Sequence, residues 1–191
     1  MNKKIEIKTP DNEIDVLLHA CCAPCSSAIV EFLIINGIRP TLFYYNPNIF
    51  PVEEYEKRKS ECIRHAKMLG LDFVDADYEH HKWLKAVSGF EREPERGARC
   101  LICFKERLAV TALYASEHGF KVFATTLATS RWKNLEQITE AGEYAASLYS
   151  GIKFWAQNWR KGGLTERRSE LVKKYDFYNQ KYCGCEFSDY Q

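Results

Sequence analysis

The chain has 191 residues, which predicts one domain spanning residues 1–191. Hydrophobic residues make up 46% and charged residues 28%, so disordered and fibrous classes are excluded. No apolar run reaches the roughly 18 residues of a membrane span, and residues 1–13 are polar and charged, unlike a secretory signal. We therefore predict a cytoplasmic protein with no membrane partner.

The formal net charge of +1 conceals an uneven distribution. Residues 1–80 carry 9 Lys/Arg and 13 Asp/Glu, whereas residues 81–191 carry 18 and 13. The basic second half could contact an anionic partner, although the same charges would also suit an ordinary solvated surface.

Short apolar runs alternate with amphipathic stretches along the chain. Residues 1–14 are predicted to be an N-terminal extension and residues 176–191 a C-terminal tail. The segment 90–99, which contains Pro94 and Gly97, is predicted to be a surface loop. The predicted strands are residues 15–20, 41–45, 72–76, 121–126 and 152–155. The predicted helices are residues 26–36, 51–70, 82–87, 100–118, 134–149 and 164–175.

This alternation predicts an α/β fold with a mostly parallel, doubly wound sheet of about five strands. Ligands of such sheets bind beyond the carboxyl ends of the strands. Cys21 and Cys22 follow the first predicted strand, Asn46 follows the second, and a loop rich in Thr and Ser follows the fourth. The sequence therefore predicts a site at this edge of the sheet.

Eight cysteines in a chain without a secretion signal are more typical of metal or redox chemistry than of disulfide staples. Cys21, Cys22 and Cys25 lie in the first strand-to-helix turn, where a helix N-terminus favours thiolates. They could instead be small buried residues of a tight turn. Cys25 could serve a neighbouring metal or none. Cys62 and His19 are predicted to be buried, with no ligand spacing around the histidine.

Cys100 and Cys103 share one face of a predicted helix, so both sulfurs can reach one metal. With Cys21 and Cys22 they make four thiolates, enough for a [4Fe–4S] cluster or a structural zinc. The adjacent pair favours the cluster, because zinc sites usually have C-x₂₋₄-C spacing on both sides. Arg96 and Arg99 flank this motif; they could ease reduction of a negative cluster or be ordinary loop residues.

Cys183 and Cys185 are separated only by Gly184. A disulfide between them would be strained and easily reduced, with Gly184 supplying backbone freedom. The pair could also bind a second metal, or be two unrelated cysteines of the tail.

A basic loop follows the fourth predicted strand. Asn134 is predicted to cap the next helix, with Gln137 completing a capping box. Arg131 and Lys133 could contact phosphate, and Trp132 could stack on a base. The alternative is a capped helix start with a solvated basic edge. The chain has neither a G-x-G-x-x-G nor a Walker A motif, so ATP use is not predicted.

The motifs LLHACCAPC, YYNPNIFPVEEYEKR, RCLIC, TTL and YCGC occur in this order between residues 15 and 187. Together they resemble the cobalamin-independent epoxyqueuosine reductase QueH family. The resemblance implies a nucleotide-hydrolase-like, HUP-related three-layer fold. It also implies reduction of epoxyqueuosine to queuosine at the wobble position of tRNA, the last step of queuosine biosynthesis.

The resemblance further implies a site and its cofactors. An additional mononuclear iron is expected beside a [4Fe–4S] cluster, with neither cobalamin nor ATP, and an external electron donor is expected as a partner. Cys25 and Cys62 fall outside the cysteines carried over. The expected cluster ligands are Cys21, Cys22, Cys100 and Cys103, and the expected redox-active or second-metal pair is Cys183 and Cys185.

Further hypotheses concern the substrate, the second metal and the alternative functions. The target base is expected to insert between Tyr45 and Asn46, and Asp75, Asp77 or Asp189 could supply a carboxylate to the second metal. A cluster-dependent tRNA sulfurtransferase is one alternative, although it would need an ATP loop. A zinc-stabilised RNA-binding domain without redox chemistry is another.

Overall fold

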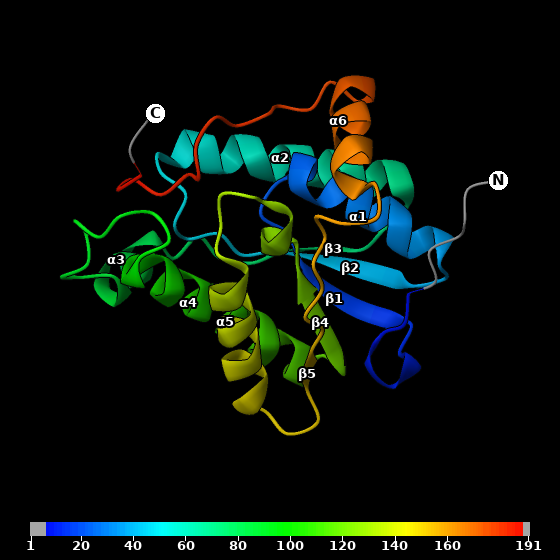
Figure 1. Ribbon diagram of the computed structural model, residues 1–191, viewed down its shortest axis with the longest axis horizontal. Helices are drawn as coiled ribbons and strands as arrows, with labels where there is room; N and C mark the ends of the chain where they lie inside the picture. The colour runs from blue at the N-terminus through cyan, green and yellow to red at the C-terminus, as the bar shows by residue number, and fades with distance from the viewer. Residues whose placement is uncertain (1–6, 189–191) are drawn as a thin grey trace.

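The fold is that of a computed structural model, which describes residues 7–188 (Figure 1). Asp189, one of the predicted carboxylate ligands, lies outside the described residues. The strands are β1 (Asp15–His19), β2 (Arg39–Tyr44), β3 (Phe73–Asp75), β4 (Val122–Thr125) and β5 (Lys153–Phe154). The helices are α1 (Ala23–Ile35), α2 (Val52–Leu69), α3 (His80–Ala86), α4 (Ala98–Glu117), α5 (Leu135–Ser147) and α6 (Leu164–Lys174). Two 3₁₀ turns, η1 (Pro10–Asn12) and η2 (Thr126–Thr129), complete the described elements.

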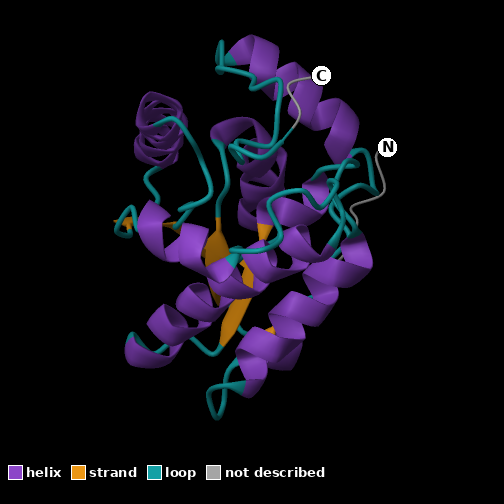
Figure 2. Ribbon diagram, turned by 90° about the vertical axis from the view of Figure 1, so that its left-hand side faces the viewer, coloured by secondary structure: helices purple, strands orange, loops and turns teal. Residues whose placement is uncertain are grey.

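All five strands form one parallel sheet in the order β3-β2-β1-β4-β5. Helices α1 and α2 cover one face, with α6 packed against α1, and α4 and α5 cover the other face (Figures 1 and 2). The predicted doubly wound α/β fold in three layers is therefore confirmed. The chain reverses its direction of winding between β1 and β4, so the carboxyl ends of these two strands border the crevice where such folds bind ligands.

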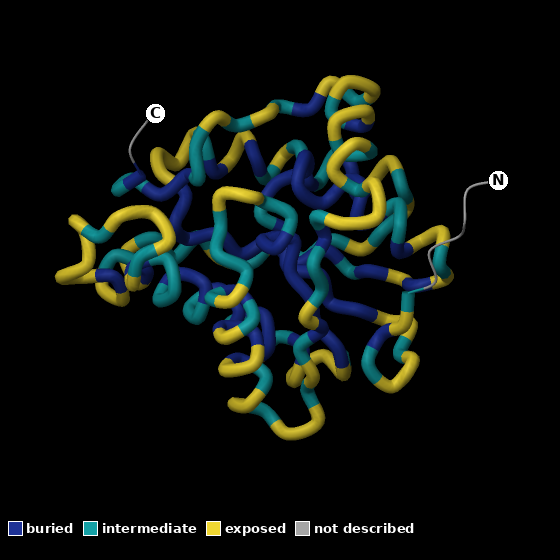
Figure 3. Tube along the Cα trace, viewed as in Figure 1, coloured by how far each residue is buried: buried dark blue, intermediate teal, exposed yellow. Residues whose placement is uncertain are grey.

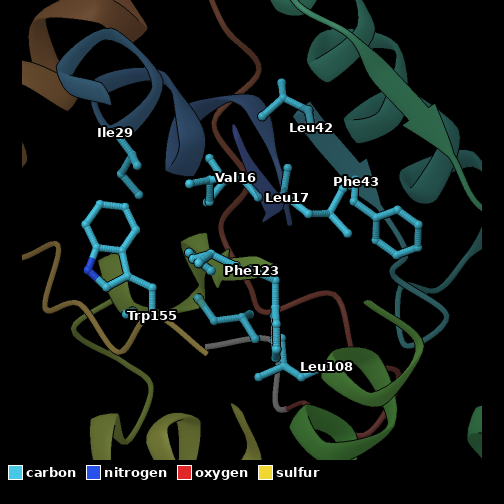
Figure 4. Close-up of a cluster of buried hydrophobic side chains, with 14 of the residues drawn as sticks. Val16, Leu17, Ile29, Leu42, Phe43, Leu108, Phe123 and Trp155 are labelled. Atoms are coloured by element: carbon cyan, nitrogen blue, oxygen red, sulfur yellow. The ribbon is translucent and has the colours of Figure 1, made fainter. Parts of the chain in front are cut away.

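The core surrounds the central strand β1, which is hydrogen-bonded on both sides. Its residues 16–19 are fully buried, as expected for a strand covered by helices on both faces (Figure 3). Side chains from the strands and from helices α1 and α4 interlock around it (Figure 4). Those labelled there are Val16, Leu17, Ile29, Leu42, Phe43, Leu108, Phe123 and Trp155.

Three helices begin earlier than predicted: α1, α4 and α3, the last of which begins at His80, two residues before the predicted start. Helix α1 begins at Ala23, with Cys22 as its N-cap residue and Pro24 in the first turn. Proline is well tolerated there because the first backbone N–H groups of a helix have no intrahelical partner. Helix α4 likewise begins at Ala98, inside the predicted loop. The early start of α1 places Cys25 within its first turn.

The segments at both ends of the described chain pack on the fold. Residues 7–14 are held by ion pairs of Glu13 with Lys121 at 2.7 Å and of Asp11 with Lys153 at 2.6 Å. The tail after α6 runs across α2 (red in Figure 1), where Tyr178 donates to Glu54 at 2.9 Å. None of the helices described is long and apolar enough to cross a membrane.

Candidate metal centre

Three thiols converge at the carboxyl end of β1. Cys21 follows the strand, Cys22 caps α1, and Cys25 lies three residues further, on the same side of the first turn. Their sulfur atoms all lie within 4.8 Å of one another. Cys22 and Cys25 are buried and Cys21 is partly buried. The structure thus includes Cys25 in the triad of cysteines 21, 22 and 25, a role that the sequence left open.

The three thiols of this triad differ in how readily they ionise. Hydrogen bonds with Cys22 and Cys25 hold the pKa of Cys21 well below its usual value, and nearby cations lower it further. Burial raises the pKa of Cys22. The hydrogen bond with Cys21 raises the pKa of Cys25 to about 12. Cys21 is therefore the thiol that carries the negative charge first.

A cavity of about 820 Å³ opens beside the triad. Its wall takes sulfur-bearing residues from three separate segments: the β1–α1 turn, helix α4 and the tail. They are Cys21, Cys25, Cys100, Cys183 and Cys185. Cys22 and Cys103, both buried, are not among the residues that line it. Of the predicted cluster ligands, Cys21 and Cys100 therefore line the cavity, whereas Cys22 and Cys103 are buried outside its lining.

The tail cysteines point in different directions. The Sγ atom of Cys183 lies 3.6 Å from Lys133 Nζ, whereas Cys185 packs with Cys103 and Trp83. All eight cysteines are free thiols, so the predicted Cys183–Cys185 disulfide is not present in the structure. Burial raises the pKa of Cys185 to about 12.

Gly184 uses the backbone freedom predicted for it, although it does not serve a disulfide. Its φ is +102°, and a Cβ atom there would lie 2.8 Å from Arg58 Nη1 and 3.1 Å from Ile49 Cγ1. Arg58 donates to the carbonyl oxygens of Cys183 at 3.0 Å and Tyr182 at 3.3 Å. The glycine therefore allows the tail backbone to approach this guanidinium closely, and the approach positions both cysteines.

The loop after η2 is held by two arginines. Arg96 donates to the Trp132 and Arg131 carbonyls at 2.8 and 3.1 Å, and Arg160 donates to the Lys133 carbonyl at 2.8 Å. The side chains of Arg131 and Trp132 remain exposed at the mouth of the cavity, 63% in the case of Trp132. Lys133, predicted to contact phosphate beside them, instead turns inward to Cys183.

The two arginines expected to influence a cluster act as structural clamps. Arg99 donates to the carbonyl oxygens of Glu91 at 2.6 Å and Phe187 at 3.2 Å, which ties the tail to α4. Arg96 holds the basic loop. Asn134 caps α5 as predicted, but Gln137 donates to the Arg96 carbonyl at 2.9 Å and does not complete a capping box.

Tyr45 and Asn46, predicted to flank a base, have different environments. The Tyr45 side chain is buried, its hydroxyl donates to Glu79 at 3.3 Å, and it does not line the cavity. Asn46 does line the cavity and donates to the Ala20 carbonyl at 3.0 Å. Only Asn46 is therefore placed to meet a bound ligand.

The predictions that Cys62 and His19 are buried agree with the structure. Cys62 is fully buried, as is His19, whose ring nitrogens bond to Thr125 Oγ1 at 2.9 Å and to the Tyr45 carbonyl at 3.0 Å. Burial, reinforced by the charge of Arg107, lowers the pKa of His19 to about 3, so this histidine is neutral. Asp75 and Asp77 do not line the cavity.

Sequence reasoning missed Gln180 and Arg107. Gln180, in the irregular tail, donates to Cys22 Sγ at 2.9 Å, and no local pattern places it there. Arg107 lines the cavity, and its position could have been inferred. It follows Cys100 and Cys103 at helical spacing, so all three lie on one face of α4.

The donor atoms of this centre are sulfurs, which suit iron–sulfur clusters and other thiophilic metals. Residues 7–188 thus define an α/β protein whose cysteine-lined cavity, at the switch point of a parallel sheet, can hold a metal group.

Comparison with known proteins identifies the family. Residues 16–191 match the family model described as Epoxyqueuosine reductase QueH. Relatives with that name include proteins from Acinetobacter baylyi, 50% identical over 97% of this chain and 85% of theirs, and from Haemophilus influenzae, 46% identical over 98% and 76%. A Thermotoga maritima relative is 37% identical over 91% of this chain and 89% of its own. The chain belongs to the epoxyqueuosine reductase QueH family, as the sequence motifs predicted.

Proposed function

We propose that this protein reduces epoxyqueuosine to queuosine at the wobble position of tRNA, the last step of queuosine biosynthesis. The observation that carries the proposal is the meeting of thiols from the β1–α1 turn, helix α4 and the tail on one cavity wall. Family membership supplies the reaction, because the relatives are named epoxyqueuosine reductases.

The proposed reaction removes the epoxide oxygen and leaves a carbon–carbon double bond. It consumes two electrons and two protons and releases one water molecule. When bound, a [4Fe–4S] cluster with an additional mononuclear iron would supply electron transfer, one electron at a time from an external donor. The chain's own contribution is to hold that group with thiolates and to position the modified base against the cavity wall.

For the cluster we propose the ligands Cys21, Cys22, Cys100 and Cys103. Cys21 and Cys22 support this assignment by their mutual proximity, with sulfurs 3.9 Å apart, and Cys100 and Cys103 by sharing one face of α4. Cys25 competes for one position, because its sulfur lies within 4.8 Å of both sulfurs of the first pair. Substituting each cysteine by serine and counting iron and sulfide separates these assignments.

For the second centre we propose Cys183 and Cys185. Both line the cavity as free thiols with different neighbours, which supports a role as metal ligands or as separate redox thiols rather than as a resting disulfide. Replacing either residue by serine should abolish conversion of the epoxide. Cys62→Ala is the matched control, since Cys62 is a buried cysteine away from the cavity.

For tRNA we propose contacts by Arg131 and Trp132 at the mouth of the cavity. The unpaired bases of an anticodon loop can be splayed out and stacked on an aromatic ring. The Arg131 guanidinium lies 4.8 Å from the centre of the Trp132 ring. The ring on which a base would stack therefore has a cation suited to phosphate beside it. Lys133, the third residue predicted for this contact, is proposed to act inside the cavity.

The test is anaerobic purification, followed by iron and sulfide counts and incubation with tRNA carrying epoxyqueuosine and a chemical reductant. We expect four cluster irons with their sulfides, an additional iron, and queuosine as the product. A colourless protein containing zinc without sulfide would support the zinc-stabilised RNA-binding alternative. Transfer of sulfur to tRNA would instead support the sulfurtransferase alternative.

A further inference from the structure

Two cations of the cavity wall have no carboxylate partner. Arg107 is only 2% exposed, and its Nη2 donates to Asn46 Oδ1, a neutral group. Its Nε is buried without a hydrogen-bond partner. Lys133 has its Nζ beside Cys183 Sγ. Within residues 7–188, neither cation forms an ion pair with an aspartate or glutamate.

Arg58, another buried cation, has the carboxylate partner that Arg107 and Lys133 lack. Arg58 is buried to a similar extent, yet its Nε binds Glu54 at 2.7 Å, so that charge is neutralised within the protein. An uncompensated buried charge is strongly unfavourable, and proteins avoid it by providing an anionic partner. Arg107 and Lys133 therefore indicate that negative charge resides in the cavity when the site is complete.

The cysteines are the groups placed to carry that charge. The Nζ atom of Lys133 lies 3.6 Å from the Sγ atom of Cys183. Arg107 lines the same cavity as Cys21 and shares one face of α4 with Cys100 and Cys103. The two cations thus approach the thiols from different elements, α4 and the loop before α5.

We propose that Arg107 and Lys133 compensate the negative charge of the thiolate-bound metal group and raise its reduction potential. This inference rests on the proposed function. Each electron received from a one-electron donor makes the group more negative by one charge. Fixed cations beside the group therefore stabilise the reduced form more than the oxidised form. Both are positioning residues, acting through the metal group without contacting the bond that breaks.

The test compares the variants Arg107→Gln and Lys133→Gln with the conservative Arg107→Lys. Arg131→Gln is the matched control, because it removes the same charge from an exposed position at the rim. Each protein is reconstituted anaerobically, its iron and sulfide are counted, and its metal group is titrated with dithionite under visible and paramagnetic resonance detection.

We expect both cavity Gln variants to hold as much iron and sulfide as the unmodified protein. At a fixed potential their ratio of reduced to oxidised group should fall at least tenfold, equivalent to about 59 mV for one electron. Arg107→Lys and Arg131→Gln should leave the ratio within threefold. Loss of the metal group from both cavity Gln variants but not from Arg107→Lys would equally show that it needs the charges.

Two results would overturn the inference alone: an unchanged potential in both cavity Gln variants with full iron and sulfide, or loss of the metal group from Arg107→Lys as well as Arg107→Gln. An unmodified protein without iron and sulfide would refute the proposed cofactor itself, and the inference with it. The metal count of the unmodified protein therefore separates the two failures.

Discussion

Replacing Gly184 by alanine should release the tail from the cavity wall. The glycine has a φ of +102°, and an added Cβ atom would lie 2.8 Å from Arg58 Nη1 and 3.1 Å from Ile49 Cγ1. Neither neighbour can move freely: Ile49 pairs with Cys185 in an isolated bridge, and Arg58 is fixed by Glu54. The strain is therefore relieved by moving the tail.

The magnitude comes from strain in the docked tail. A non-glycine residue in such a backbone conformation costs about 1–3 kcal/mol. Opening the tail breaks the hydrogen bonds from the Arg58 guanidinium to the Cys183 and Tyr182 carbonyls in both proteins, so these bonds do not change the difference between them. Because the close contact with Arg58 adds to the backbone strain, we take about 3 kcal/mol, and the open population of the tail should then rise about 100-fold.

The assay is alkylation of Cys185, which is 7% exposed, in metal-free protein with mass-spectrometric detection. Gly151→Ala is the control, because Gly151 has a φ of +80° but no atom within 4 Å of the added Cβ. The control should lose about 1 kcal/mol of unfolding free energy, with Cys185 as protected as before. Equal labelling rates of Cys185 in the two variants would refute this account of the tail.

The remaining predictions concern tRNA, a helix cap and pH. Trp132→Ala should weaken tRNA binding by about 1–3 kcal/mol without changing the metal content, as measured by filter binding; unchanged affinity would remove this ring from the interface. Asn134→Ala should lower the unfolding free energy by about 1 kcal/mol, because α5 loses the two N–H bonds accepted by Asn134 Oδ1. Burial lowers the pKa of His65 to about 4, so the unfolded chain binds its proton first and stability should fall as pH drops from about 6.5 towards 4. In urea unfolding, His65 should account for about 1–2 kcal/mol of the stability lost between pH 7 and pH 5, alongside a similar share from His19, so His65→Phe should reduce the loss by that amount; an unchanged loss would refute the assignment.

The layout of the fold was accessible from local patterns. Apolar runs and helix stops predicted every strand and helix of the described chain, because a parallel sheet covered on both faces leaves a strong hydrophobic signal. The predicted ends of the helices were less accurate. Helix α1 starts three residues before its predicted start, and the prediction failed because Pro24 suits the first turn of a helix as well as the end of a strand. Because α1 begins earlier than predicted, Cys25 lies in its first turn, close to Cys21 and Cys22.

The site was only partly predictable. Spacing placed Cys100 and Cys103 on one helix face, and strand ends placed Cys21 near Asn46, both by short-range rules. The inward turn of Lys133 and the position of Gln180 depend instead on contacts between segments far apart in the chain. No periodicity encodes such contacts, because the loop and the tail are fixed by arginine side chains bonding to carbonyl groups.

The tail follows every described strand and helix in chain order. It supplies Cys183 and Cys185 to the cavity wall, whereas Cys21, Cys25 and Cys100 come from the β1–α1 turn and from α4. Two of the five cavity thiols therefore depend on an irregular segment that is held in place by the side chains of Arg58 and Arg99 and not by the sheet. The cavity wall is complete only while this segment is docked.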